Sequence, residues 1–315
     1  MRQVVYGALA ALMAASSPLT AQSLSPIPET IADQPPPPDD WFTFGDDQKR
    51  MTVPVTVAGQ GPYNFIVDTG SERSVVSHDL AGLLDLSPGR KVHVTTMTNS
   101  ATVGTVIVPS LRLSSATAEN IEAPALDQQN LGAPGLIGID ALQNHSVQID
   151  FNAGHMTLSR SMRRAPDRAA PNEIVITARS RFGQLIVTDA HYHGRRIAVV
   201  IDTGSPVTVG NLAFQRALVA PPRPIGTVTL ISALGQSMVA SYGAIDRLTI
   251  GGVEFHQVPI AFADATPFRR FDLIGKPALL LGMDALRLFR NVRIDFANHE
   301  ISFTLPYPQM LAANR

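Results

Sequence analysis

The same four-residue segment occurs twice in this chain of 315 residues, and the repetition limits how the chain can fold. Asp68-Thr69-Gly70-Ser71 and Asp202-Thr203-Gly204-Ser205 are 134 positions apart. Ahead of each copy stand an alternating apolar run, a turn with glycine and a second apolar run, a pattern typical of two antiparallel strands joined by a tight turn. The sequence therefore predicts two similar halves that are rich in strands.

The repeat extends well beyond these four residues. Leu136-Ile137-Gly138-Ile139-Asp140-Ala141-Leu142 in the first half corresponds to Leu280-Leu281-Gly282-Met283-Asp284-Ala285-Leu286 in the second. Each aspartate segment is also followed by a strand pattern and then by a short helical pattern, which lies at 79–84 in the first half and at 212–218 in the second. The second half is ten residues longer between its aspartate and its closing glycine, and we place the insertion around residues 268–277.

The composition allows a buried core in both halves and argues against some classes of partner. Hydrophobic residues make up 45% of the chain and charged residues 16%, and the length is enough for roughly two domains. The net charge is −1 and no basic stripe occurs, so nucleic acid is not an expected partner. The absence of cysteine excludes disulfides and a cysteine-linked lipid anchor.

The N-terminus is typical of an exported protein. Residues 1–21 contain Arg2, an apolar stretch from Val4 to Ala15 and a small-residue region, which together predict a secretory signal peptide cleaved near Ala21. The apolar stretch is too short to span a bilayer, so we expect no stable membrane anchor. The alternative is an N-terminal helix that packs on the domain. A cysteine-free exported protein fits a periplasmic location, or a secreted one.

Proline-rich and basic stretches set the expected boundaries. Residues 22–40 hold several prolines and are interpreted as a linker or a pro-segment. A basic stretch with prolines between the two halves lacks periodicity and is interpreted as a connection. The expected organisation is a first lobe at 41–160, an interlobe linker at 161–173, a second lobe at 174–306 and a tail at 307–315.

The Asp-Thr-Gly-Ser segment and the later apolar-apolar-Gly segment resemble the hallmarks of the retropepsin-like and pepsin-like aspartic proteases. The resemblance covers residues 50–160 and 174–305, and each half is similar in size to one retropepsin subunit. It implies an all-β acid protease fold of two pseudo-symmetric retropepsin-like β-barrel lobes, each with one or two short helices. Because both lobes lie in one chain, a monomer is expected to be sufficient.

The resemblance implies that Asp68 and Asp202 form a catalytic pair. Such a pair hydrolyses peptide bonds with an activated water and needs no metal and no cofactor. Two neighbouring carboxylates do not readily ionise together, so they share one proton. One carboxylate then removes a proton from the water while the other protonates the carbonyl oxygen.

The other residues of each segment are expected to support the pair. By the same resemblance, this supporting loop has two threonines that hydrogen-bond across the lobes, two glycines that let the loops approach, and two serines: Thr69, Thr203, Gly70, Gly204, Ser71 and Ser205. The serine hydroxyls are expected to donate hydrogen bonds to the carboxylates. Such bonds favour the ionised form and lower a carboxyl pKa, so an acid-shifted pH optimum is predicted.

Hairpin patterns at 92–108 and 227–241 occupy matching places in the two halves and are candidate flaps. A flap would cover the site and hold a polypeptide substrate in an extended conformation. Two ordinary surface hairpins are the alternative interpretation. The candidate flap tips are Thr98, Asn99 and Ser100 in the first half and Leu234, Gly235 and Gln236 in the second.

Four other conspicuous residues are interpreted as structural. Asp140 and Asp284 each precede an Ala-Leu helical pattern and are expected to cap a helix. His191 and His193 lie at a predicted hairpin turn, and no third ligand occurs at metal-binding spacing.

Two other functions remain open on the sequence alone. A catalytically silent protein of this fold would be a peptide-binding or regulatory module in the periplasm, although the presence of both aspartates favours the enzyme. A glycosidase would use two carboxylates farther apart in an aromatic-lined groove. An aromatic content of 6% and a single tryptophan argue against it.

Overall fold

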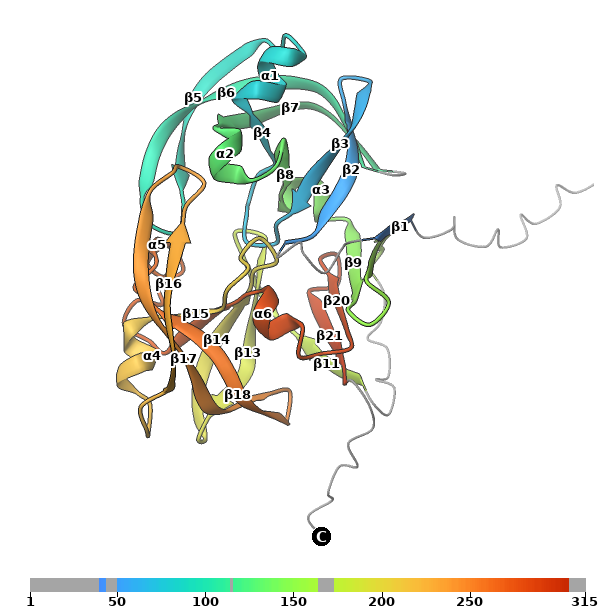
Figure 1. Cartoon of the computed structure of the whole chain (residues 1–315). Coiled ribbons are helices and arrows are strands. Elements are labelled where there is room, and N and C mark those ends of the chain that lie inside the picture. Colours follow the sequence, from blue (N-terminus) through green and yellow to red (C-terminus); the bar gives the residue numbers. More distant parts are fainter. Residues whose placement is uncertain (1–39, 44–49, 114–115, 164–172, 306–315) are drawn as a thin grey trace, which may run out of the picture. The chain divides into compact units, whose positions relative to one another are not determined.

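Almost all of the regular secondary structure is β-strand in the computed structural model, which describes residues 40–43, 50–113, 116–163 and 173–305 (Figure 1). These residues belong to one unit, Asp39–Arg315. The expected signal peptide, pro-segment and tail, and most of the expected interlobe linker, lie outside the described residues.

Six strands of the first half close into a barrel. Alternate residues of the first strand, Val53, Val55 and Val57, are buried, as the period of two predicted. A pairing of β2 with β6 closes the ring, and β5 lies outside it. In sheet order, the strands are β2 (Thr52–Val57), β3 (Gln60–Val67), β8 (Gly135–Ile137), β4 (Val75–Ser77), β7 (Ala116–Leu126), β6 (Ser100–Leu113) and β5 (Pro88–Thr95).

The second half repeats the seven strands of the first and adds one strand, β12, at the edge of the sheet beside β13. A pairing of β13 with β17 closes its ring, and β16 lies outside it. Each barrel also contains two parallel pairs, β3 with β8 and β4 with β7 in the first, and β14 with β19 and β15 with β18 in the second. The expected fold of two pseudo-symmetric β-barrel lobes is confirmed. In sheet order, the strands are β12 (Arg179–Arg181), β13 (Gln184–Tyr192), β14 (Arg195–Ile201), β19 (Ala278–Leu281), β15 (Val209–Gly210), β18 (Val253–Phe262), β17 (Ser237–Ile250) and β16 (Arg223–Ile231).

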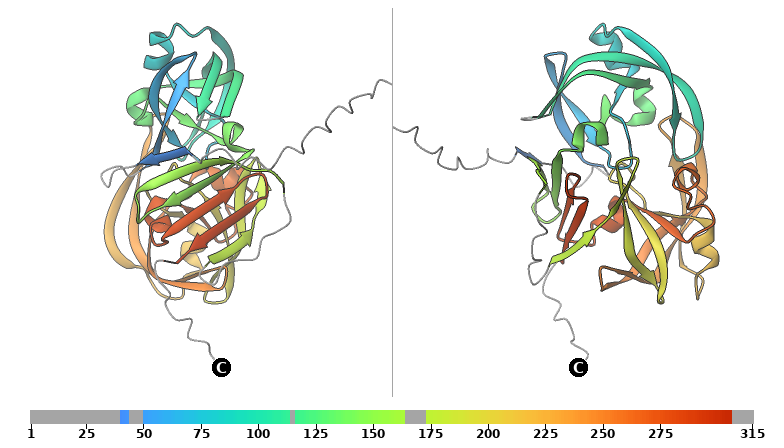
Figure 2. Two further views of the ribbon diagram at one scale, coloured as in Figure 1. Left: turned by 90° about the vertical axis from the view of Figure 1, so that its right-hand side faces the viewer. Right: turned by 180° about the vertical axis from the view of Figure 1, so that it is seen from behind.

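A third, six-stranded sheet joins the two halves, and the left view of Figure 2 shows it face-on. Its central contact is the antiparallel pairing of β9 with β20, in which Val147 lies opposite Ile294. The repeat in the sequence does not indicate which strands pair across the halves. In sheet order, the strands are β1 (Asp40–Thr43), β10 (His155–Arg160), β9 (His145–Asp150), β20 (Asn291–Asp295), β21 (Glu300–Thr304) and β11 (Glu173–Thr177).

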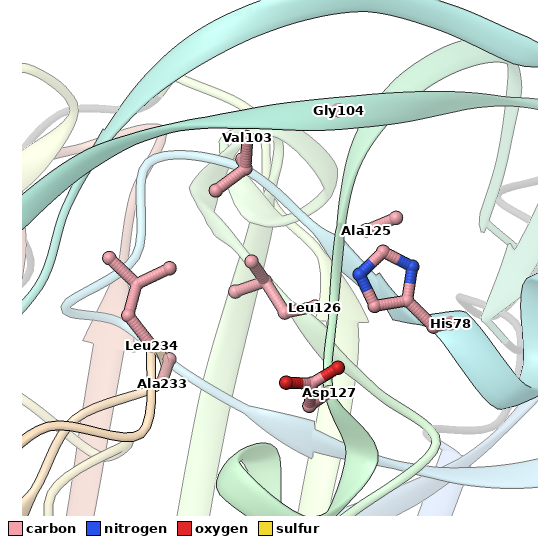
Figure 3. Close-up of a pocket in the computed structure, with 8 residues that line it drawn as sticks. All are labelled: His78, Val103, Gly104, Ala125, Leu126, Asp127, Ala233 and Leu234. Carbon is pink, nitrogen blue, oxygen red and sulfur yellow. The ribbon is translucent and has the colours of Figure 1, made fainter.

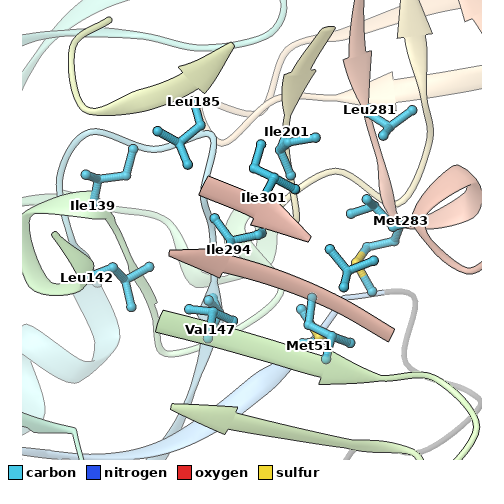
Figure 4. Packing of buried hydrophobic residues seen from close by; sticks show 14 of the residues in the cluster. Met51, Ile139, Leu142, Val147, Leu185, Ile201, Leu281, Met283, Ile294 and Ile301 are labelled. Carbon is cyan, nitrogen blue, oxygen red and sulfur yellow. The ribbon is translucent and has the colours of Figure 1, made fainter. Parts of the chain in front are cut away.

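Aliphatic side chains fill the space between the shared sheet and the barrels (Figure 4). Val147, Ile294 and Ile301 of the sheet and Ile201 and Leu281 of the second barrel are at most 1% exposed. Each such side chain contributes about 1.5–3 kcal/mol by burial, against about 1 kcal/mol for a typical hydrogen bond. The packing therefore supplies most of the attraction between the halves, and the polar contacts at their boundary set its geometry.

Six short helices follow strand ends in the described part of the chain. Ser77 caps the first of them by accepting a hydrogen bond from Leu80 N at 3.0 Å. The fifth helix, Thr266–Arg270, lies at the start of the expected ten-residue insertion. No described helix has both the length and the apolar character needed to cross a membrane. The helices are α1 (His78–Leu83), α2 (Gln128–Leu131), α3 (Ile139–Leu142), α4 (Leu212–Arg216), α5 (Thr266–Arg270) and α6 (Met283–Leu286).

Candidate active site

The two repeated aspartates lie at the ends of corresponding strands. Asp68 directly follows β3 and Asp202 directly follows β14. Each donates its backbone N–H to the parallel closing strand beside it, Asp68 to Ile137 O and Asp202 to Leu281 O, both at 3.0 Å. The strands of the apolar closing segments therefore fix the position of each aspartate at the end of its own strand.

The threonines of the two loops interlock across the lobe boundary. Thr69 N donates to Thr203 Oγ1, and Thr203 N donates to Thr69 Oγ1, both at 3.1 Å. Each hydroxyl in turn donates to the backbone of the other lobe, Thr69 to Ile201 O at 3.0 Å and Thr203 to Val67 O at 2.8 Å. Both threonines are buried, so these expected bonds hold the two loops together without competition from water.

Glycine is required where each loop meets the opposite carboxylate. A Cβ at Gly70 would lie 2.7 Å from Oδ1 of Asp202. A Cβ at Gly204 would overlap the carboxylate of Asp68. Each carboxylate therefore lies against the glycine of the other lobe, and the structure brings the two aspartates together at the lobe boundary.

Backbone amides donate to the carboxylates from within each loop. Gly70 N donates to Asp68 Oδ1 at 2.8 Å. Gly204 N and Ser205 N both donate to Asp202 Oδ1 at 3.1 Å. These bonds favour the ionised forms and hold the two carboxylates in fixed orientations.

The serine hydroxyls do not donate to the carboxylates, so that prediction is wrong. Ser71 Oγ donates to Arg73 O at 2.7 Å, and Ser205 Oγ donates to Val207 O at 2.7 Å. In each loop, the backbone carbonyl two residues further along the same turn lies within hydrogen-bond distance of the serine hydroxyl. The hydroxyl donates to this carbonyl instead of to the carboxylate. The predicted acid-shifted pH optimum therefore loses its basis.

Burial and mutual repulsion raise the pKa values of the pair. Burial, followed by the charge of Asp68, raises the pKa of Asp202 to about 7. Burial also raises the pKa of Asp68, against the backbone bond from Gly70 and the charge of Arg50. Because the two buried carboxylates repel each other, they give up their protons in separate steps. The singly protonated pair then persists up to about pH 7.

Asp140 and Asp284 lie behind the two loops in the first turn of their helices, where they accept the N–H of Ala141 at 2.9 Å and of Ala285 at 2.8 Å, but neither is the N-cap residue itself. The N-cap position of each helix is the glycine before it. Asp140 also accepts hydrogen bonds from Ser74 N at 2.9 Å and Ser74 Oγ at 2.7 Å. Asp284 accepts the equivalent bonds from Thr208, at 2.8 Å and 2.6 Å. The two carboxylates tie the turn after each motif to the closing segment.

The two candidate flaps are hairpins as expected, and the tip of the first reaches the second lobe. β5 and β6 leave residues 96–99 as the first tip, so Ser100 belongs to strand β6 and not to the tip. Thr98 and Asn99 lie in it, with Asn99 Oδ1 accepting from the Thr96 hydroxyl at 2.8 Å. Met97 packs against an apolar cluster of the second lobe, and its carbonyl accepts from Thr266 N at 2.9 Å.

The tip of the second flap reaches the first lobe in the same way. Residues 232–236 connect β16 to β17, so Leu234, Gly235 and Gln236 lie at the tip as predicted. Leu234 packs against an apolar cluster of the first lobe that includes Leu126. Figure 3 shows Leu234 and Leu126 on the wall of a cavity of about 250 Å³ that is lined by this tip and by strands β6 and β7. Both flaps are therefore docked on the opposite lobe.

Leu234→Ser is expected to loosen the second flap. The change removes apolar contact with the first lobe worth about 1 kcal/mol, so the equilibrium constant for docking should fall several-fold and the undocked state should become more populated by that factor. Hydrogen exchange at the amides of residues 232–236 should accelerate to match. Ile231→Ser is the matched control, because Ile231 is 64% exposed on the same hairpin. Equal acceleration in both variants would show that Leu234 does not hold the flap.

Two polar contacts between the lobes were not predicted. Arg270 donates to both carboxylate oxygens of Glu72, at 2.7 Å and 2.6 Å. The side-chain amide of Gln184 donates to Gly70 O. The only sequence signal for the contact between Arg270 and Glu72 is that Arg270 lies within the insertion of the second half. Because the first half has no equivalent residue, the repeat does not indicate a partner for Arg270.

A third unpredicted residue, Arg50, lies close enough to the pair to act on both carboxylates. Its Nη2 donates to Leu131 O at 2.6 Å. The histidines singled out in the sequence lie elsewhere, with His193 Nε2 2.7 Å from Asp246 Oδ2 at a hairpin turn. Among the described residues, no three potential metal ligands lie together.

Comparison with known proteins agrees with this geometry. No curated protein matches the chain. The model of the family described as aspartyl protease matches residues 53–141 and 188–285, which together are more than half of the chain. The two matched segments correspond to the two barrels, and each contains one Asp-Thr-Gly-Ser loop and one closing segment. The chain therefore belongs to the aspartyl protease family.

Proposed function

We propose that this protein is an aspartic endopeptidase that hydrolyses peptide bonds with a water activated between Asp68 and Asp202. The observation that supports this most is the convergence of two buried carboxylates from separate lobes, each held by backbone amides and by interlocked threonines. Such a pair can hold one proton between two acids up to about pH 7, which suits it to acid–base catalysis.

The chemistry needs only the two carboxyl groups and water. The ionised carboxylate takes a proton from the water as the water oxygen bonds to the peptide carbonyl carbon, and the protonated carboxyl gives its proton to the carbonyl oxygen. When the resulting diol collapses, the carbon–nitrogen bond breaks. The nitrogen receives the proton held by the first carboxyl group, and a diol hydroxyl returns a proton to the second. The pair ends the cycle as it began.

The proposed substrate is a polypeptide in an extended conformation. The two flaps lie across the lobe boundary, and strands β5 and β16 at their outer edges each pair on one side within their sheets. An extended segment held between hairpins and loops presents alternate side chains to opposite faces. A monomer suffices because one chain contributes both aspartates. We further propose export to the periplasm, which N-terminal sequencing of the mature protein would test.

The test is cleavage of a diverse peptide pool by the purified protein between pH 4 and pH 8, with and without pepstatin. We expect new peptide termini from the unmodified protein and none from Asp68→Asn, because one carboxyl group cannot fill both roles. Cleavage that survives Asp68→Asn would exclude the proposed mechanism. Binding of peptides without cleavage at any pH would instead favour the silent binding module.

A further inference from the structure

Two residues occupy equivalent places in the halves but differ in charge. Arg50 lies 18 positions before Asp68, and Gln184 lies 18 positions before Asp202. The duplication therefore relates Arg50 to Gln184. A difference in charge at one pair of equivalent positions makes the environments of the two aspartates unequal.

The strand register places Arg50 opposite the first aspartate. In the antiparallel pairing of β2 with β3, Thr52 lies opposite Ile66. The ladder continues one step further, because Val67 N donates to Met51 O at 3.0 Å. The next step in this register pairs Arg50 with the residue after Val67, which is Asp68. Arg50 is half-buried there, so its charge is only partly screened by water.

The same register places Gln184 opposite the second aspartate. In the pairing of β13 with β14, Ile186 lies opposite Val200. Two further steps pair Gln184 with Asp202. Gln184 is 5% exposed and its amide donates to Gly70 O, so a neutral group occupies this buried place.

We propose that Arg50 holds Asp68 ionised and thereby leaves the shared proton on Asp202. Its guanidinium is fixed by the 2.6 Å hydrogen bond from Nη2 to Leu131 O, at the end of helix α2. A positive charge opposite one carboxylate stabilises the ionised form of that carboxylate more than that of its neighbour. In keeping with this, the charge of Arg50 lowers the pKa of both aspartates and that of Asp68 acts to raise the pKa of Asp202.

Other charges around the pair do not favour the ionisation of Asp68 over that of Asp202. The flap tips, residues 96–99 and 232–236, contain no ionisable side chain. Glu72 and Arg270 form an ion pair with each other across the lobes, so their fields largely cancel at the aspartates.

The carboxylates behind the loops do not favour Asp68 over Asp202 either. Asp140 and Asp284 occupy equivalent positions in the two halves and are bonded to Ser74 and Thr208 in the same way. Asp284 also accepts a hydrogen bond from the Tyr242 hydroxyl at 3.0 Å, but neither Asp140 nor Asp284 is among the main causes of the pKa shifts of the two catalytic aspartates.

The inference rests on the proposed function only for its chemical consequence. If the protein is an endopeptidase, Asp68 removes the proton from water and Asp202 protonates the peptide carbonyl oxygen. Arg50 then acts through Asp68, because it determines which of the two aspartates is ionised, and it does not itself touch the reacting atoms.

The test is a titration of the aspartate carboxyl carbons by NMR on substrate-free protein labelled with ¹³C at aspartate Cγ. Asp68→Asn and Asp202→Asn assign the two signals. We expect Asp68 to ionise first in the unmodified protein. Arg50→Gln should raise the pH at which Asp68 ionises by about one unit, because the opposing charge is lost. Arg50→Lys, which keeps the charge, should retain most of the original value.

Arg112→Gln is the matched control, since Arg112 is exposed on the far end of β6. Ionisation of Asp202 before Asp68, or a shift in Arg50→Gln no larger than in Arg112→Gln, would overturn the inference. The titration needs no substrate, so a protein that fails to cleave peptides would contradict the proposed function while still testing Arg50.

Discussion

Asp202→Asn is expected to abolish peptide hydrolysis while making the folded protein more stable at neutral pH. The amide can neither hold nor deliver the shared proton, so kcat/KM should fall by at least ~10³-fold. Stability should change in the opposite direction, because the carboxylate of Asp202 is buried beside that of Asp68 and an amide carries no charge.

The sign of the stability change follows from the raised pKa. The pKa of Asp202 is about 7 in the folded protein against an ordinary value of 3.8. Between these values the folded state binds the proton more tightly than the unfolded state, so the free energy of unfolding falls as the pH rises through this window. The uncharged amide of the variant would not experience this loss. The melting temperature of the variant should therefore exceed that of the unmodified protein by several degrees at pH 8, and the two should agree closely at pH 4.

Thermal denaturation at both pH values checks this expectation. Asp189→Asn is the control, since Asp189 is exposed and its replacement should leave the pH dependence unchanged. If Asp202→Asn loses as much stability between pH 4 and pH 8 as the unmodified protein does, then Asp202 does not carry the raised pKa. Residual hydrolysis near the original rate would contradict its catalytic role.

Gly204→Ala is expected to cost about 10²-fold in kcat, although it changes no polar group. Its methyl group would overlap the carboxylate of Asp68, which must then move or rotate. A displacement of about 1 Å at a reacting group is enough for such a loss. Crowding at this buried boundary should also lower the free energy of unfolding by about 1–3 kcal/mol.

Gly82→Ala is the matched control for this substitution. Gly82 is exposed in helix α1, and a Cβ there would meet no atom within 4 Å. Alanine favours a helix over glycine, so this variant should be fully active and no less stable. Peptide hydrolysis and urea denaturation of both variants give the comparison. Full activity in Gly204→Ala would show that the loop has room that the structure does not indicate.

The strands of the barrels and the correspondence between the two halves could be predicted because their signals are local and repeated. Each strand of the barrels has its own alternation of apolar residues, and the second copy of each segment confirms the first. The convergence of Asp68 and Asp202 followed from the duplication, since each half supplies one carboxylate at the same point in its fold.

The features that were missed depend on contacts between distant segments. The pairing of β9 with β20 joins residues of different halves, and neither strand alone indicates its partner. Docking of Met97 and Leu234 on opposite lobes has the same origin. The serine hydroxyls were assigned wrongly for a local reason, because a carbonyl of the same turn accepts their proton.

Arg50 could have been found in the sequence by extending the alignment of the halves upstream. An offset of 134 positions aligns it with Gln184, but a single arginine before a strand suggests an ordinary exposed side chain. Only the register of β2 with β3 shows that it faces the first aspartate.

The unequal residues at positions 50 and 184 have a consequence for how such a site can evolve. In an assembly of two identical subunits, an arginine on one side is always accompanied by an arginine on the other. Joining the subunits in one gene removes this constraint, and a mutation can then alter one side alone. The two acids can acquire separate, permanent tasks before any substrate arrives, whereas in a homodimer only an asymmetric ligand can make them differ.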